Sequence, residues 1–157
     1  MVCSHSLSSN GFFSNIYSQR KGDENMFSEK LGLTLLFSIL VWLGATLFFV
    51  FFGSAVLVDP YQQNFLTAFL LLELATAVVL YIVFVIFRKL DPSPYAVVKL
   101  GLIGSAVGLI IDAFVLWNRD VFFSGLSSEQ LLAFTIWMAF AYGLYLLIPL
   151  FMKKGNK

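Results

Sequence analysis

The chain has 157 residues, of which 59% are hydrophobic and only 12% are charged. A soluble domain normally carries about 25% charged residues, so this composition points to a membrane protein. The net charge of +1 argues against a nucleic-acid-binding protein, which needs a clustered basic surface.

Cysteine and histidine are almost absent. The single cysteine, Cys3, cannot form an internal disulfide or a CxxC redox pair, and the single histidine, His5, lies in the polar N-terminal segment. A histidine-based metal site or catalytic triad therefore has no residues to build it. No P-loop, HExxH or GxSxG motif occurs either. We therefore expect no catalytic residues, no metal ion, no cofactor and no enzymatic activity.

Residues 1–30 form a polar, serine-rich segment without an apolar stretch of signal-peptide length. We expect this segment to be disordered. The codons for residues 20–23 (Arg-Lys-Gly-Asp) can contain a purine-rich ribosome-binding sequence. We therefore expect a bacterial chain whose natural start is Met26. At the other end, residues 152–157 form a basic tail.

Four apolar runs occupy the rest of the chain, and each meets or exceeds the roughly 20 residues that a helix needs to cross a bilayer. The runs cover residues 31–58, 65–87, 97–117 and 131–151. Asp59-Pro60 ends the first run and residues 91–94 end the second, because a residue that precedes proline resists the helical conformation. Ser127 and Gln130 have capping-box spacing at the start of the fourth. The sequence predicts an all-α, polytopic four-helix bundle in the bacterial inner membrane, in contact with the lipid bilayer.

The basic residues predict the orientation of the four spans. Nine of them fall on one side of the membrane: Arg20, Lys21, Lys30, Arg88, Lys89, Lys99, Lys153, Lys154 and Lys157. Only Arg119 falls on the other side. The positive-inside rule therefore predicts that both termini and the loop between the second and third spans are cytoplasmic.

Two carboxylates interrupt the apolar runs, Glu73 in the second span and Asp112 in the third. An acid near the centre of a spanning helix costs about 3 kcal/mol on insertion scales, and such acids usually face a bundle interior. At about 1.5 Å per residue, Glu73 lies about 12 Å and Asp112 about 7.5 Å from the outer ends of their spans. Thr135 and Tyr142 of the fourth span fall in the same layer, and the side chain of Arg119 is long enough to reach down toward it.

These five residues form a candidate proton or cation site that is open to the outside. Two carboxylates close together in a low dielectric cannot both ionise easily, so the pair can share one proton. The alternative is that both acids are neutral or hydrogen-bonded and only hold the second and third helices in register. The sequence leaves both interpretations open.

The third span has one face of small residues, on which Gly101, Gly104, Ser105 and Gly108 lie together with Asp112. Small residues at this spacing let another helix approach closely. This face is interpreted as a helix-packing surface, either within the bundle or for assembly with a second copy or another membrane protein.

Aromatic residues near the span ends are typical of a membrane-interface belt. We assign Tyr61, Tyr95, Trp117 and Trp137 to this belt. The outer loop at residues 119–126 has an apolar centre and is expected to lie at the interface as a short amphipathic segment.

The C-terminal part of the chain resembles a known group of proteins. The segments GLIIDAFVLWN and LSSEQLLAFTIWMAFAYGLYLLIPL, with FF between them, are similar to small bacterial four-helix membrane proteins of unknown function over residues 95–151. The resemblance implies a four-helix membrane protein and no established activity. Small multidrug-resistance transporters also have four spans, but their essential carboxylate lies in the first, where this chain has none.

Two functional hypotheses follow. The first is a non-enzymatic membrane protein with a structural or interaction role, which assembles through the glycine face. The second is a small proton- or cation-linked transporter that uses Glu73 and Asp112.

Overall fold

The computed structural model describes residues 30–154 of the chain. The helices described below belong to one compact unit, residues 32–157, apart from the first residue of α2. The predictions of a disordered segment at residues 1–30 and of a start at Met26 fall outside the described residues, Lys30 excepted.

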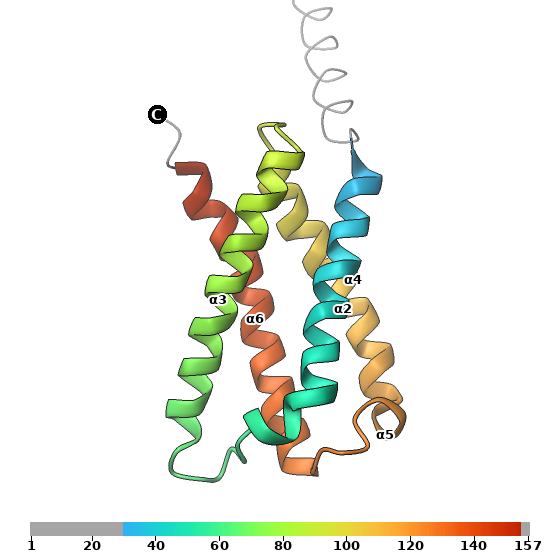
Figure 1. Ribbon diagram of the computed structural model, residues 1–157, viewed down its shortest axis with the longest axis vertical. Coiled ribbons are helices and arrows are strands. Elements are labelled where there is room, and N and C mark those ends of the chain that lie inside the picture. The colour runs from blue at the N-terminus through green and yellow to red at the C-terminus, as the bar shows by residue number, and fades with distance from the viewer. Residues whose placement is uncertain (1–29, 155–157) are drawn as a thin grey trace, which may run out of the picture. The chain divides into compact units, whose positions relative to one another are not determined.

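All regular elements of the described residues are helices (Figure 1). They are α2 (Leu31–Val56), α3 (Phe65–Leu90), α4 (Ala96–Trp117), the short α5 (Arg119–Phe122) and α6 (Ser128–Lys154). By length and composition, α2, α3, α4 and α6 are each able to cross a membrane. The prediction of an all-α protein with four long apolar helices is therefore confirmed.

Two of the helices, α3 and α6, extend three residues beyond the apolar runs that predicted them. Helix α6 begins three residues earlier than predicted because the capping box forms, with the Gln130 N–H donating to Ser127 Oγ and the Ser127 N–H donating to Gln130 Oε1, both at 3.2 Å. It then continues through Pro149 to Lys154, so the start of the predicted basic tail is its last turn. Helix α3 runs on to Leu90, since basic residues in a last turn interact favourably with the helix dipole.

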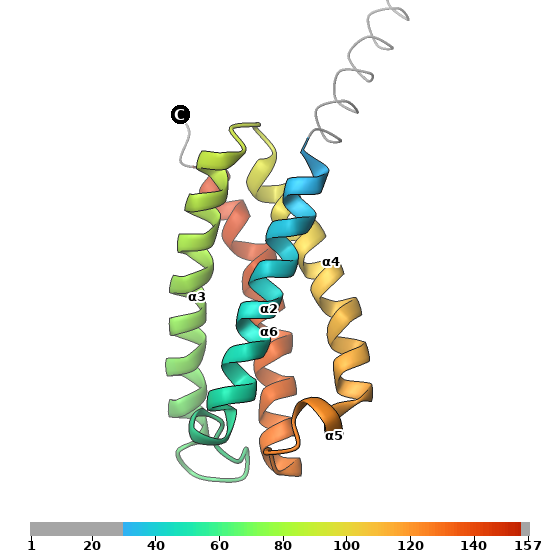
Figure 2. The ribbon, with the colours of Figure 1, turned by 45° about the vertical axis from the view of Figure 1, so that its right-hand side comes forward.

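Helix α6 packs against both α3 and α4, and the long helices run alternately up and down (Figures 1 and 2). The side-chain amide of Gln130 in α6 binds the end of α2, because its Nε2 donates to the carbonyls of Ser54 and Leu57 at 3.0 and 3.1 Å. The end of α2 is thereby fixed beside the start of α6.

The buried apolar side chains form two clusters. The first gathers near the α5 end of the bundle and contains Phe49, Leu57, Val115, Phe123, Ala133, Phe134 and Trp137. The second gathers near the loop between α3 and α4 and contains Leu80, Phe84, Phe87, Ala96, Leu100 and Tyr145. Residues near the middle of all four long helices lie between the two clusters, and the candidate site is there.

The outer surface of the bundle is strongly apolar. Phe51 of α2, Leu71 of α3 and Phe114 of α4 are 72, 64 and 65% exposed. Soluble proteins rarely expose so much continuous apolar surface. This surface therefore lies against the hydrocarbon of a lipid bilayer.

Candidate intramembrane binding site

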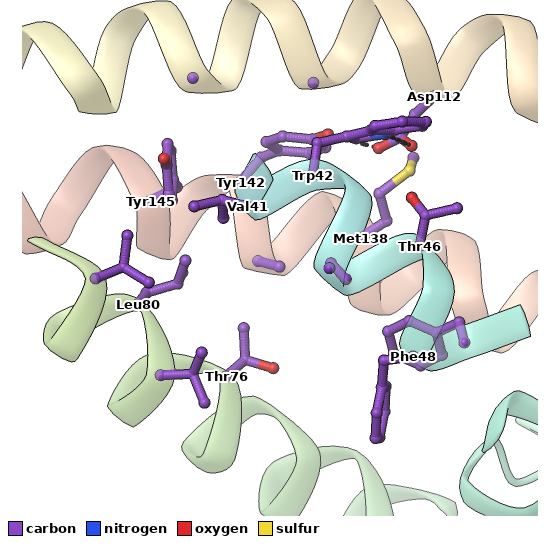
Figure 3. Close-up of a pocket in the computed structure, with 18 of the residues that line it drawn as sticks. Val41, Trp42, Thr46, Phe48, Thr76, Leu80, Asp112, Met138, Tyr142 and Tyr145 are labelled. Carbon is purple, nitrogen blue, oxygen red and sulfur yellow. Dashed lines mark hydrogen bonds between the residues drawn. The ribbon is translucent and has the colours of Figure 1, made fainter. Parts of the chain in front are cut away.

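A cavity of about 620 Å³ lies in the middle of the bundle and is lined by all four long helices (Figure 3). Leu40 and Phe48 of α2 and Val79 of α3 line it and are also 52, 40 and 58% exposed. These exposed lining residues place its mouth between α2 and α3, toward the lipid. The volume lies within the range of about 300–1,000 Å³ that is typical of ligand pockets.

Asp112 is the acidic residue in the cavity wall, and its carboxylate is held by side chains from two other helices. Trp42 Nε1 of α2 donates to Asp112 Oδ1 at 2.7 Å, and the Tyr142 hydroxyl of α6 donates to Asp112 Oδ2 at 2.5 Å. Figure 3 shows the three side chains meeting at one side of the cavity. A hydrogen-bonded cluster therefore ties α2, α4 and α6 together at this level.

The glycine face of α4 makes this cluster sterically feasible. A Cβ at Gly108 would overlap the ring of Tyr142, and a Cβ at Gly104 would overlap the ring of Tyr145. Because both positions lack a Cβ, the two tyrosine rings of α6 lie directly against the α4 backbone.

The same face is closed along its length by α6. A Cβ at Gly101 would come within 2.9 Å of Pro149 Cγ, and Ser105 is buried. The hypothesis that the glycine face serves assembly with a second copy or a partner is therefore corrected, because α6 of the same chain covers it.

A second polar contact lies in the cavity wall and joins α6 to α3. Trp137 Nε1 donates to Thr76 Oγ1 at 3.0 Å, and the Thr76 hydroxyl donates to the carbonyl of Leu72 at 2.9 Å. Trp137 is only 8% exposed, so its assignment to an interfacial aromatic belt is wrong. Its position within α6 satisfies the indole N–H inside the bundle, as a buried tryptophan requires.

Glu73 is separate from the Asp112 cluster. It is 4% exposed, does not line the cavity, and neither carboxylate oxygen has a hydrogen-bond partner in the described part of the chain. The two acids therefore share no hydrogen bond. The structure does not join them into the predicted paired site.

The other two predicted site residues also lie apart from the acids. The Thr135 hydroxyl donates to the carbonyl of Leu131 within its own helix. Arg119 is 62% exposed and pairs with Asp120 at 3.7 Å. Of the five predicted residues, Asp112 and Tyr142 are the two that share a hydrogen bond. Between residues 30 and 154, no group of three or more metal-ligating acidic, histidine or cysteine side chains comes together.

A buried ion pair lies at the end of the bundle that carries the α3–α4 loop. Lys99 Nζ lies 3.2 Å from Asp91 Oδ2, and the side chains are 0 and 1% exposed. Burial by itself would raise the pKa of Asp91, but the hydrogen bond from the Ser93 N–H and the Lys99 ammonium hold it below its ordinary value of 3.8. Lys99 is therefore a packed and paired residue, and the orientation predicted from the basic residues stays a prediction.

Three contributors to this architecture were missed in the sequence analysis: Trp42, the Thr76–Trp137 contact and the Asp91–Lys99 pair. One signal was present for Trp42, because an indole in the middle of an apolar span needs a partner for its N–H. Neither of the other two contacts has a local sequence signal.

Comparison with curated proteins finds the uncharacterized protein YnzE of Bacillus subtilis (strain 168). It is 54% identical to this chain over 96 residues, and the match covers 61% of this chain and 95% of YnzE. This relative is a bacterial protein without a characterised activity, as the resemblance of the C-terminal half implied. No family model matches the chain, and no solved structure matches it.

Proposed function

We propose that this chain, which belongs to the family of YnzE, is a non-enzymatic multi-pass protein of the bacterial cell membrane that binds an apolar molecule from the lipid phase. The observation that carries the proposal is the cavity of about 620 Å³ in the middle of the bundle, whose mouth lies between α2 and α3. Its lining is almost wholly apolar, with the Asp112 cluster as a polar anchor on one side.

The position of the mouth supports this function. Close-packed protein interiors contain few voids larger than a water molecule, so a cavity of this size is unusual and leaves room for a guest. An apolar cavity stays dry and takes apolar guests. Because Leu40, Phe48 and Val79 place the mouth toward lipid, a guest dissolved in the bilayer reaches the cavity without crossing a polar phase.

Binding of an apolar guest is tested with 1-bromododecane in detergent micelles. A bound molecule should quench the fluorescence of Trp42 and Trp137, the two tryptophans that line the cavity. The experiment uses a Trp117→Phe background, since Trp117 is 85% exposed and would be quenched at the surface. We expect saturable quenching.

Two matched variants make the result specific. Ala75→Phe places a ring at the cavity wall and should abolish the saturable component. Ala106→Phe adds the same ring on an exposed position of α4 outside the cavity and should leave the quenching unchanged. Linear quenching that is the same in all three proteins would refute the proposed function.

The proposed orientation places both termini in the cytoplasm. Arg88 and Lys89 in the last turn of α3, together with the basic residues at both ends of the chain, support it without Lys99. In a Cys3→Ser background, a membrane-impermeant maleimide added to intact cells should label Asp120→Cys and not Lys89→Cys. Labelling of Lys89→Cys and not of Asp120→Cys would show that both termini lie outside the cell.

Proton- or cation-linked transport through Glu73 and Asp112 is a second candidate. It is supported by the buried Glu73 carboxylate, whose oxygens have no hydrogen-bond partner in residues 30–154. Since the two acids share no hydrogen bond, a proton would have to pass between them by way of another group. In proteoliposomes, Glu73→Gln and Asp112→Asn should each abolish pH-driven flux. Unchanged flux in both variants would exclude this candidate.

A further inference from the structure

The Asp112 carboxyl group has no cationic partner among the side chains that the structure describes. Its two oxygens accept hydrogen bonds from neutral donors, Trp42 and Tyr142. Among the side chains that the structure describes, the ion pairs join Lys99 to Asp91 and Arg119 to Asp120, and none reaches Asp112. Buried charges in proteins are normally paired. The cavity wall thus offers a fixed carboxylate whose cationic partner is not supplied by these residues.

The rest of the lining is rich in aromatic rings. Besides Trp42 and Tyr142, the rings that line the cavity belong to Phe37, Phe48, Phe49, Phe134, Trp137 and Tyr145. The face of an aromatic ring carries negative electrostatic potential and attracts organic cations, most strongly where water is excluded. The lining therefore complements positive charge through its rings as well as through Asp112.

Tyr145 adds a free polar atom to this wall. It is 5% exposed, lines the cavity, and its hydroxyl has no hydrogen-bond partner in the described residues. A buried hydroxyl without a partner is costly. This hydroxyl is therefore free to bind a polar substituent of a guest.

We infer that the cavity prefers a lipophilic organic cation to a neutral guest, with the charge of the cation against Asp112 and its apolar body among the aromatic rings. This inference rests on the proposed function, since it assigns a chemical class to the guest of the same cavity. Such a cation partitions into the bilayer and reaches the cavity through its mouth between α2 and α3. Neutral and anionic molecules of the same shape lack the interaction with Asp112.

The test compares two probes of nearly equal size and opposite charge. Binding of tetraphenylphosphonium and of tetraphenylborate to the purified full chain is measured by equilibrium dialysis in micelles of a neutral detergent, with protein-free micelles subtracted. We expect the phosphonium to bind about tenfold more tightly or better, since a charge pair in a water-excluded site outweighs the same pair in water. Equal binding of the two ions would overturn the inference.

Two variants locate the selectivity. Asp112→Asn keeps the shape of the side chain and should remove the preference for the phosphonium. Asp120→Asn removes a carboxylate that is 97% exposed and does not line the cavity, and it should retain the preference. A full phosphonium preference in Asp112→Asn would overturn the assignment to Asp112. If Asp112→Asn does not fold, the comparison of the two ions on the wild-type protein decides.

Failure of this inference is distinguishable from failure of the proposed function. If 1-bromododecane quenches saturably but the two ions bind equally, the cavity binds apolar guests without charge selection and only the inference is wrong. If 1-bromododecane does not bind at all, the proposed function itself is wrong.

Discussion

Replacing Lys99 by methionine removes the cation from the buried pair at the α3–α4 end of the bundle. Asp91 then remains 1% exposed, with the hydrogen bond that it accepts from the Ser93 N–H but without the ammonium that lies 3.2 Å away. Removing one partner of a buried ion pair typically costs about 3–5 kcal/mol, because the other charge is left buried and uncompensated. We expect Lys99→Met to lower the free energy of unfolding by about this amount.

The assay is reversible unfolding by sodium dodecyl sulfate in mixed micelles, followed by tryptophan fluorescence. Lys89→Met is the matched control, since Lys89 is exposed near the same end of the bundle, and it should change stability by less than about 0.5 kcal/mol. Adding Asp91→Asn to Lys99→Met should recover most of the loss, because a neutral pair is often tolerated where a lone charge is not. A Lys99→Met protein as stable as the control would refute the reasoning.

The same pair gives a pH dependence of defined sign. The folded protein holds the pKa of Asp91 below its ordinary value of 3.8. A group whose pKa is depressed by folding contributes stability above its unfolded pKa and loses it as the pH falls through the folded pKa. The stability difference between wild type and Asp91→Asn should be constant from about pH 7 to pH 5 and shrink below about pH 4. A difference that grows on acidification contradicts this assignment.

Three further stability predictions use the same unfolding assay. Gly104→Ala should lose about 1–3 kcal/mol, because its Cβ overlaps the ring of Tyr145. Gly143→Ala should instead gain up to about 1 kcal/mol of helix stability, because nothing lies within 4 Å of its Cβ. Equal changes in stability for Gly104→Ala and Gly143→Ala would contradict the packing of α4 against Tyr145. Thr76→Val should cost about 1–3 kcal/mol, since it leaves the indole N–H of Trp137 buried without an acceptor, and a neutral effect would show that this contact does not stabilise the fold.

The helices themselves were predictable from the sequence. Apolar runs of sufficient length, separated by Asp-Pro pairs and a capping box, predict four spanning helices because a bilayer leaves the backbone few alternatives. The ends of α3 and α6 were placed three residues short, since polar residues there continue the helix outside the apolar run. The hydropathy of a segment indicates which residues lie in the hydrocarbon, but it does not show at which hydrogen bond a helix ends.

The candidate site was predictable only where its residues share one helix or one clear face. The small residues of α4 indicated that Asp112 lies on a packed face, and Tyr142 was placed in its layer by depth. Trp42 was not found, although it lies at four-residue spacing with Thr34, Ser38 and Thr46, the polar residues of α2 that are buried in the bundle. Contacts between residues as far apart in sequence as Trp42 and Asp112 depend on tertiary packing.

The burial of Lys99 was also not predictable from the sequence. It stands five residues beyond a proline-containing loop and looks like one more cytoplasmic charge. Its burial against Asp91 follows from the close packing of α3 and α4 at that end. Composition rules count such a charge as exposed, because they contain no information about its partner.

Photocrosslinking shows directly whether a lipophilic cation occupies the cavity at Asp112. A triphenylphosphonium that carries an aryl azide is irradiated with the protein, and the adducts are located by mass spectrometry of peptides. The account predicts adducts within residues 37–49, 72–83 and 134–145, which line the cavity, and their loss in Asp112→Asn. Adducts confined to lipid-facing positions such as Leu109 and Phe114, and unchanged in Asp112→Asn, would contradict it.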